Sequence, residues 1–312
     1  MLKTDVGKLV ELAGKVESHY LPFESPGRER YFQKCQPKSR LIDNPSEQLK
    51  KIQKRIHRQL LRSICFPGHI FGAVPKRSVL DNAEHHVGAF LLVTIDVRKC
   101  FPSITNKQVY HVWRTVLGCS PPVAALLTRL TTFQRRLPQG SPASPLISNL
   151  FIWSIDQPIR EACEARGLIY STFIDDLAFS GARAREMIQI AASVLASNGL
   201  RISHNKIRIM GPQDIKLLTG TRLGELQARV SKEKISRVRS GIHKLNIGLV
   251  PQEEHQAYVD SLIGQLRYIE QLSSKDGLKC IRELTKCKIN GISSNAQRFL
   301  KARRLPQNVP IS

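Results

Sequence analysis

The chain has 312 residues, 41% of them hydrophobic and 23% charged, and its formal net charge at pH 7 is +23. Residues 1–200 carry 27 basic and 16 acidic residues, and residues 201–312 carry 21 and 9, so the excess belongs to the folded body and not to a short tail. This distribution favours nucleic acid held in an extended groove. It argues against an anionic membrane, because no basic stretch has the Trp-bearing amphipathic pattern of a membrane-surface helix.

Cysteine usage and hydropathy predict the compartment. The seven cysteines include no C-x-x-C pair, which is typical of reduced thiols in a cytosolic protein. The first residues lack the continuous apolar core of a signal peptide, and no apolar run approaches the length of a membrane span. We therefore expect a cytoplasmic protein with no membrane partner.

The first part of the chain predicts helices separated by basic turns. Residues 1–20 have the pattern of an amphipathic helix, and residues 22–40 are rich in turn formers and bases. Ser46 is a suitable N-cap for a helix that ends near residue 63. A later helix follows, with Asp81 or Asn82 as its cap. The polar face of the 46–63 helix is either solvated or phosphate-facing, and it carries Lys50, Lys51, Lys54, Arg55 and Arg58.

Two stretches place carboxylates at the ends of apolar strands. Leu91–Asp96 is a continuous apolar run that ends in an acid, which alone could simply cap the turn after its strand. Tyr170–Phe179 predicts a tight hairpin with Asp175 and Asp176 at its tip. Three acids at strand ends can together hold two Mg²⁺ ions about 3.5–4 Å apart for in-line phosphoryl transfer.

The segment between these acids predicts two helices, a rigid loop and a long helix. The helices span 106–117 and 121–132. The loop, Arg135–Pro145, contains three prolines, a glycine and two serines, which forbid regular structure and expose backbone N–H groups and the Gln139 amide. A single helix over 146–165 follows. We expect the loop to form one wall of a substrate pocket.

The last third of the chain predicts a change from mixed to helical structure. A helix at 184–198 precedes a strand at 200–210 that contains Lys206, and a hairpin joins 216–223 to 227–230. We place a boundary near Ser231. Beyond it the pattern predicts only helices, at 233–246, 252–271, 276–288 and 293–303.

From about residue 38 to residue 229, these motifs resemble those of a reverse transcriptase. Four blocks occur in the family's order, which is far more specific than any one of them. They are Asp96 with Phe101 for the first catalytic motif, Leu137–Pro145 for the LPQG-x-P-x-SP loop, Phe173–Asp176 for the Tyr-x-Asp-Asp box and Gly199–Lys206 for the fourth motif. Phe173 replaces the usual tyrosine, which removes a hydroxyl and leaves both acids.

Within that family the chain resembles the bacterial retron reverse transcriptases. Asn82–His86 fits their Asn-Ala-x-x-His signature. Leu218–Gly220 nearly fits their Val-Thr-Gly signature, with leucine in place of valine. We also expect no added endonuclease or maturase domain.

The resemblance implies an α+β fold of the right-hand polymerase type, with fingers, a palm that combines an antiparallel sheet with helices, and a helical thumb. The N-terminal helix and fingers would occupy residues 1–90, and the palm residues 91–231, with part of the fingers (about 105–140) interleaved. The basic, RNA-binding thumb would occupy residues 232–312.

The resemblance also implies the metal site. Two Mg²⁺ ions would be held by Asp96, Asp175 and the Val97 carbonyl, with Asp176 supporting them. One ion would lower the pKa of the attacking primer hydroxyl, and the other would neutralise the triphosphate of the deoxynucleotide.

Further residues are implied for the nucleotide and the RNA. Lys38 and Arg40 would grip the β- and γ-phosphates, Gln139 would line the pocket, and Phe101 would exclude a 2′-hydroxyl. Lys206 would protonate the leaving pyrophosphate, or it is an exposed base on an edge strand. The expected RNA contacts are Asn82, His86, Lys232, Lys234, Arg237 and Arg239.

A retron enzyme is expected to reverse transcribe a dedicated structured non-coding RNA from an internal guanosine 2′-hydroxyl, giving a branched RNA–DNA called msDNA. Its partners would be that RNA, its product, dNTPs and a toxic effector from the same operon, in anti-phage defence. Two alternatives remain open. One is another bacterial reverse transcriptase, of the abortive-infection or intron-derived type; the other is a non-catalytic RNA-binding scaffold.

Overall fold

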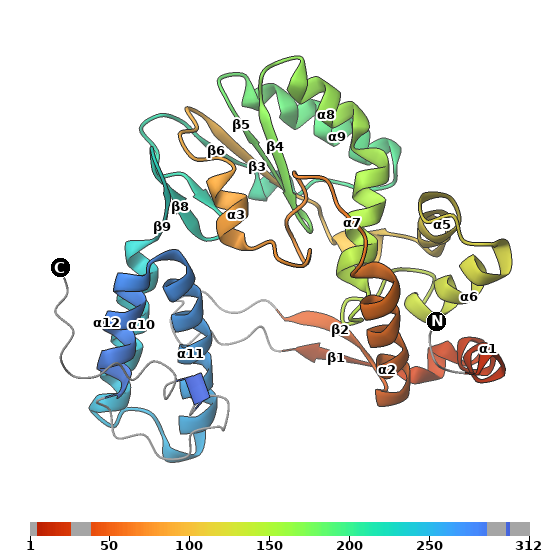
Figure 1. Ribbon diagram of the computed structural model, residues 1–312, viewed down its shortest axis with the longest axis horizontal. Coiled ribbons are helices and arrows are strands. Elements are labelled where there is room, and N and C mark those ends of the chain that lie inside the picture. Colours follow the sequence, from red (N-terminus) through yellow and green to blue (C-terminus); the bar gives the residue numbers. More distant parts are fainter. Residues whose placement is uncertain (1–4, 26–38, 286–297, 300–312) are drawn as a thin grey trace. The chain divides into compact units, whose positions relative to one another are not determined.

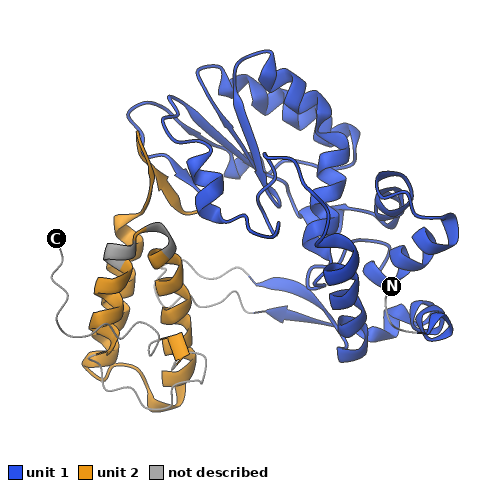
Figure 2. Cartoon of the chain, viewed as in Figure 1, with its two compact units in different colours: residues 1–219 blue, residues 220–312 orange. Residues whose placement is uncertain are grey.

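The computed structural model describes residues 5–25, 39–285 and 298–299. The chain divides into two compact units, Met1–Thr219 and Gly220–Ser312 (Figure 2). The boundary expected near Ser231 falls inside unit 2, because the hairpin that precedes it packs on a helix of that unit. Across the described ranges, we find no helix with both the length and the apolar character needed to cross a bilayer.

Unit 1 is built on a four-stranded antiparallel sheet with strand order β4-β5-β3-β6. Leu92, Val93 and Ile95 of the central strand are completely buried, as the apolar run predicted for a strand covered on both faces. The outer edge of β4 is covered too, since the Phe71 N–H donates to the Thr172 carbonyl at 2.8 Å. The strands are β3 (Leu92–Asp96), β4 (Ile169–Phe173), β5 (Asp176–Ser180) and β6 (Arg208–Met210).

Helices cover both faces of this sheet (Figure 1). Helix α3 (Val79–Glu84) lies on one face, and α7 (Ser144–Ile155), α8 (Gln157–Glu164) and α9 (Met187–Ser197) lie on the other. The cap of α3 is Ser78, in a capping box with Asp81. The cap predicted at Asp81 or Asn82 was therefore three or four residues late.

The single helix predicted over 146–165 is two helices that meet at Asp156. Pro158 lies in the first turn of α8, and its missing N–H cannot continue the hydrogen bonding of α7. The buried Asp156 carboxylate fixes the break, because it accepts hydrogen bonds from His69 Nε2 and Arg160 Nε, both at 2.8 Å. Later, the short helix η4 (Ala184–Glu186) precedes α9.

The N-terminal part contains a two-stranded antiparallel sheet that the sequence did not predict. It pairs β1 (Tyr20–Ser25) with β2 (Arg40–Pro45). Leu21, Phe23 and Leu41 of this sheet are exposed, so the strands lack the alternation that marks a half-buried strand. Around the sheet lie α1 (Val6–Gly14), the 3₁₀ turn η1 (Val16–His19), α2 (Glu47–Ile56) and the π-helical turn η2 (His57–Leu61).

The helices between β3 and the rigid loop are confirmed. They are α5 (Asn106–His111) with its π-helical continuation η3 (Val112–Val116), and α6 (Pro121–Thr131). The short helix α4 (Cys100–Ser103), which precedes them, was not predicted. The strand predicted over 200–210 was too long. His204–Lys206 forms a 3₁₀ turn, η5, and only the last three residues of the stretch pair in the sheet. Unit 1 continues into the short strand β7 (Leu217–Leu218).

Over residues 220–285, unit 2 is a hairpin followed by three α-helices that pack against one another. Val238, Leu262 and Leu266 are among its buried residues. The first three predicted helices are confirmed. The fourth, at 293–303, falls outside the described residues except for 298–299. The elements are β8 (Thr221–Leu223), β9 (Ala228–Val230), α10 (Lys232–Asn246), the 3₁₀ turn η6 (Gln252–Glu254), α11 (His255–Leu272) and α12 (Ser274–Thr285).

Candidate active site

The sheet brings the three predicted acids together at one end. Asp96 is the last residue of β3 and lies directly opposite Asp176, the first residue of β5, in the antiparallel register. Their side chains therefore share one face of the sheet. Asp175 lies in the two-residue turn between β4 and β5, and its carbonyl accepts the Val97 N–H at 2.8 Å. The predicted hairpin is thus present, with one acid in its turn and one at the start of its second strand.

The turn that carries Asp175 has a strained backbone. Ile174 has φ of 60°, a conformation that is rare for a β-branched residue. Gly72 passes so close to the turn that a Cβ at this position would lie 2.5 Å from the Ile174 nitrogen. The Gly72 carbonyl in turn accepts a hydrogen bond from the buried Asn149 amide. The turn is therefore held in one position by its neighbours, as strained backbone at functional sites generally is.

Ionisation of the two hairpin acids is unfavourable in the metal-free protein. Burial, followed by the charges of Asp175 and Asp96, raises the pKa of Asp176 to about 6. Burial and the Asp96 charge also raise the pKa of Asp175, while Lys206 and Arg40 act in the opposite direction. A bound cation would reverse both effects.

Asp96 is engaged by a base and a hydroxyl. Lys206 Nζ lies 2.7 Å from its Oδ2 atom, and Ser203 Oγ donates to its Oδ1 atom at 2.6 Å. Within the described ranges, no three His, Cys, Asp or Glu side chains are grouped to hold a metal ion in this arrangement. The donor set still suits a hard divalent cation, since it consists of carboxylates beside a backbone carbonyl. Ser203 lies within the fourth motif, Gly199–Lys206, but sequence analysis did not identify it as a site residue.

The loop that carries Gln139 is fastened to β2. The buried Asp43 carboxylate accepts two hydrogen bonds from Arg136, at 2.9 and 3.2 Å, and one from the Gln139 N–H at 3.0 Å. The Asp43 N–H donates to the Gln139 carbonyl at 2.8 Å. Gly140, with φ of 148°, would place a Cβ 2.5 Å from the Asp43 carbonyl oxygen. These hydrogen bonds join two segments almost a hundred residues apart into one rigid wall. The local sequence of neither segment indicated this contact.

The other predicted nucleotide contacts lie in the same unit. Phe101 is partly exposed in α4, directly after the tight turn that follows β3. Arg40, the first residue of β2, is exposed and acts on the Asp175 charge. Lys38 lies outside the described residues.

Comparisons with known proteins identify the family. Residues 32–240 match the family described as reverse transcriptase (RNA-dependent DNA polymerase). The chain is 30% identical over 250 residues to the retron Ec86 reverse transcriptase of Escherichia coli, covering 79% of this chain and 76% of that protein. The chain belongs to the retron reverse transcriptases. Its family membership makes it an RNA-directed DNA polymerase with the α+β, right-hand polymerase fold that the motifs implied.

More distant relatives of this retron reverse transcriptase share less of their length with it. The retron Se72 enzyme of Salmonella heidelberg is 28% identical over 57% of this chain and 48% of its own, and the retron Mx65 enzyme of Myxococcus xanthus is 27% identical over 85% and 64%. Among solved structures, a foamy viral protease-reverse transcriptase with double-stranded DNA matches with a TM-score of 0.46 and 16% identity, over 87% of this chain and 41% of that one. A Candida albicans telomerase with a fragment of telomeric RNA matches with a TM-score of 0.48 and 9% identity, over 95% and 62%.

Asn82 and His86, the retron signature residues, were expected to contact RNA. Both are buried, with 1% and 0% exposure, and they bond to the sheet: His86 to Ser171 and Ser180, and Asn82 to Ser171. The expected RNA contact is therefore corrected to an internal one. Sequence spacing could not distinguish an RNA contact from an internal contact, because an amide and an imidazole can form hydrogen bonds in both settings.

The four bases expected to grip RNA in unit 2 of the retron reverse transcriptase separate into two pairs. Lys232 and Arg237 of α10 are exposed. Lys234 lies over the Tyr268 ring, 3.2 Å from its centroid, and Arg239 lies 3.8 Å from Glu283. The first pair is available to a partner, and the second has interactions within the unit.

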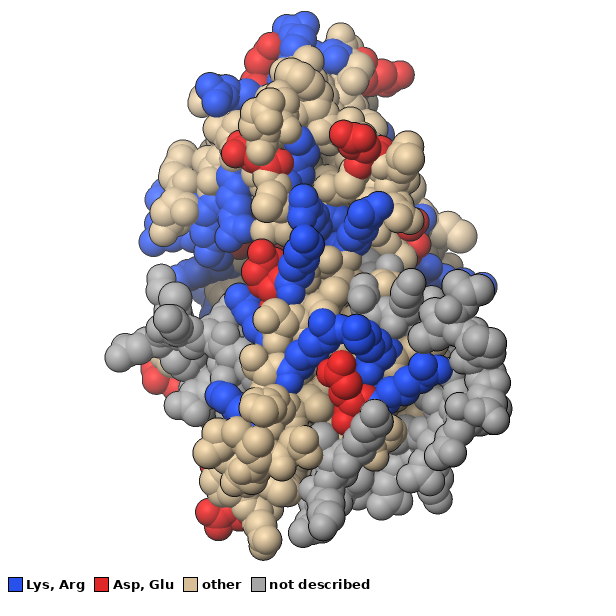
Figure 3. All heavy atoms as spheres, turned by 90° about the vertical axis from the view of Figure 1, so that its left-hand side faces the viewer, with Lys and Arg blue, Asp and Glu red and all other residues tan. Residues whose placement is uncertain are grey.

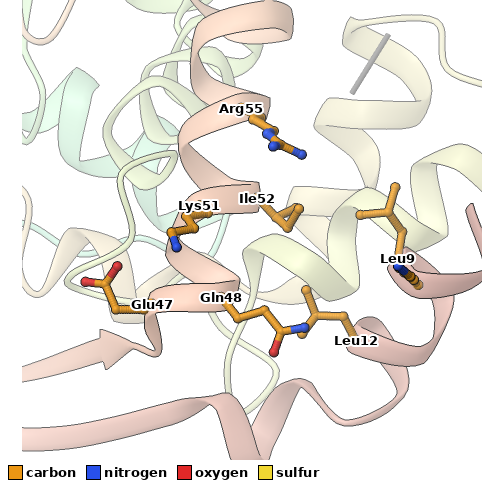
Figure 4. Close-up of a pocket in the computed structure, with 8 residues that line it drawn as sticks. Leu9, Leu12, Glu47, Gln48, Lys51, Ile52 and Arg55 are labelled. Atoms are coloured by element: carbon orange, nitrogen blue, oxygen red, sulfur yellow. The ribbon is translucent and has the colours of Figure 1, made fainter. Parts of the chain in front are cut away.

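Basic side chains also cover other parts of the surface. Viewed from one side, Lys and Arg cover much more of the surface than Asp and Glu (Figure 3). In unit 1, a pocket of about 420 Å³ lies between α1 and α2, where Leu9 and Leu12 face Ile52 (Figure 4). Lys51 and Arg55 also line it. The bases of α2 lie opposite its buried stripe and are at least partly exposed, so their ammonium and guanidinium groups are accessible to phosphates.

Proposed function

We propose that this retron reverse transcriptase copies a dedicated structured RNA into DNA, starting from an internal guanosine 2′-hydroxyl, to give branched RNA–DNA, and that it acts in anti-phage defence beside a toxic effector. The observation that carries the chemistry is the meeting of Asp96, Asp175 and Asp176 at one end of the sheet. Membership of the retron family supports the RNA substrate and the product.

The three acids and the Val97 carbonyl would hold two Mg²⁺ ions, which would lower the pKa of the attacking hydroxyl and offset the charge of the triphosphate. The work of the chain is to fix these donors. The close approach of Gly72 and the Val97–Asp175 hydrogen bond position the turn. Lys206 holds Asp96 in place, and its ammonium group is close enough to the acids to donate a proton to the leaving pyrophosphate.

The nucleotide would be held from two sides. Arg40, together with Lys38, would bind the triphosphate, and the effect of Arg40 on the Asp175 pKa supports its place near the acids. The wall built by Asp43 and Arg136 would present Gln139 to the nucleotide. Phe101 would lie below the sugar, where a 2′-hydroxyl would collide with its ring.

The RNA would be bound by basic side chains that are exposed at the surface. In unit 2, Lys232 and Arg237 fit this role, and in unit 1 the basic face of α2 fits it. RNA helices are recognised mainly through shape and phosphates, which scattered Lys and Arg side chains suit better than a fixed set of hydrogen bonds does.

Sequencing the nucleic acid that co-purifies with the protein tests the substrate, and primer extension tests the chemistry. We expect one structured RNA joined to DNA through a 2′–5′ branch. Changing both Asp175 and Asp176 to Asn should abolish the DNA while the RNA still co-purifies. Unbranched DNA of mixed sequence would favour another class of reverse transcriptase. RNA without any polymerisation by the parent protein would point to a binding scaffold.

A further inference from the structure

A buried polar network joins α3, which carries Asn82, and the turn after it, which carries His86, to both strands of the hairpin that carries the acids. His86 Nδ1 lies 2.7 Å from Ser180 Oγ on β5, and His86 Nε2 lies 2.7 Å from Ser171 Oγ on β4. Ser171 Oγ donates to Asn82 Oδ1, also at 2.7 Å. All four side chains are at most 2% exposed. One imidazole therefore bridges two neighbouring strands in the interior.

The hydrogen bonds of this network fix a single tautomer. The Ser171 hydroxyl gives its proton to Asn82, so its oxygen accepts from His86 Nε2–H. His86 Nδ1 is then unprotonated and accepts from the Ser180 hydroxyl. Burial lowers the pKa of His86 to about 3, so the ring is neutral at physiological pH, as this arrangement requires. The network has one direction, from Ser180 through His86 and Ser171 to Asn82.

The network lies on the same face of the sheet as the acids. Ser171 pairs with Ala178, and Ser180 is two residues beyond Ala178, so both serines share a face with Asp176. Asp96 lies on this face as well. His86 therefore supports the part of the hairpin remote from its turn, while Gly72 packs against the turn itself.

We propose that His86 is a positioning residue, which holds β4 and β5 against α3 so that Asp175 and Asp176 meet Asp96 at the geometry the reaction needs. Asn82 orients Ser171 and thereby the ring. The proposal rests on the proposed polymerase function of the three acids. It assigns the retron signature residues to the catalytic hairpin instead of to the RNA.

Three variants break the network in graded ways. His86→Leu removes both bonds to the strands and keeps the space filled. Ser180→Ala removes one bond, and His86→Gln can restore one. A matched control is Gln53→Leu, because the completely buried Gln53 amide also makes two hydrogen bonds, to the Tyr20 hydroxyl at 2.8 Å and the Leu130 carbonyl at 2.9 Å, and touches no part of the hairpin.

The first readout is primer extension on a generic primer-template. We expect His86→Leu to lower kcat about 10–100-fold, the range found when groups that orient metal ligands are removed. KM for the nucleotide should change little, since the hydrogen bonds of His86 go to the hairpin strands. His86→Gln should recover part of the loss. Gln53→Leu should lose comparable stability in urea unfolding, with kcat near that of the parent.

The second readout needs no catalysis. Binding of Tb³⁺ to the free protein, followed by its luminescence, should weaken about 10-fold or more in His86→Leu and stay unchanged in Gln53→Leu. A His86→Leu protein that is folded, binds Tb³⁺ like the parent and loses no more kcat than the control would overturn the proposal. If the parent itself extends no primer, the proposed function fails, while the Tb³⁺ comparison still tests the positioning role.

Discussion

Replacing Asp176 by Asn should stabilise the metal-free protein while it impairs catalysis. The pKa of Asp176 is raised from 3.8 to about 6 by burial and by the two neighbouring acids. Each pKa unit corresponds to about 1.36 kcal/mol, so the ionised carboxylate lowers the free energy of unfolding by up to about 3 kcal/mol. Asn keeps the shape of the side chain without its charge.

The effect should depend on pH in one direction. Between pH 4 and 6 the unfolded chain releases the Asp176 proton while the folded protein retains it, so stability falls as the pH rises through this window. The difference between Asp176→Asn and the parent should therefore be near zero at pH 4 and reach its full value above about pH 7.

Urea unfolding in EDTA measures this difference. Both tryptophans, Trp113 and Trp153, lie in unit 1 with the acids, so their fluorescence follows the relevant unit. Glu164→Gln, which removes an exposed carboxylate of unit 1, is the control and should change nothing. Equal stability of Asp176→Asn and the parent at pH 8, or a gain that is the same at pH 4 and pH 8, would refute the electrostatic reasoning.

Two further outcomes test the nucleotide and RNA contacts. Phe101→Ala should open space below the sugar and allow ribonucleotide incorporation in primer extension; unchanged discrimination would remove Phe101 from this role. Changing Lys232 and Arg237 to Gln should weaken RNA binding and lower the slope of log K against log salt by roughly 0.7–0.9 for each lost phosphate contact. The same change at Lys234 and Arg239 should leave the slope nearly unaffected, and a larger effect there would contradict the assignment.

Local sequence predicted the parts of the site that depend on local structure. Asp175 and Asp176 stand between apolar β-forming runs, and that pattern predicts a hairpin wherever the rest of the chain folds. The contacts of Asp96 could not be predicted in this way. Its partner Ser203 is more than a hundred residues away and becomes a neighbour only when β3 and η5 meet.

The errors have related causes. The β1–β2 sheet was missed because its exposed apolar side chains give no alternation. Pro158 was a local signal for the break at Asp156, but the apolar stripe at the start of the predicted 146–165 helix favoured a single helix. Asn82 and His86 were assigned to RNA because they belong to the retron signature, and a sequence motif does not show whether a side chain faces solvent.

The placement of the catalytic turn depends on the absence of a Cβ atom at Gly72. Ile174 takes up a backbone conformation that its branched side chain resists, and room for it exists only because position 72 ends at Cα. Gly72 and Ile174 fit against each other, although about a hundred residues separate them in the sequence. Any side chain at position 72 would clash with the turn and displace Asp175 from its position beside the other acids. A substitution that removes no catalytic group could therefore still abolish the activity of the enzyme.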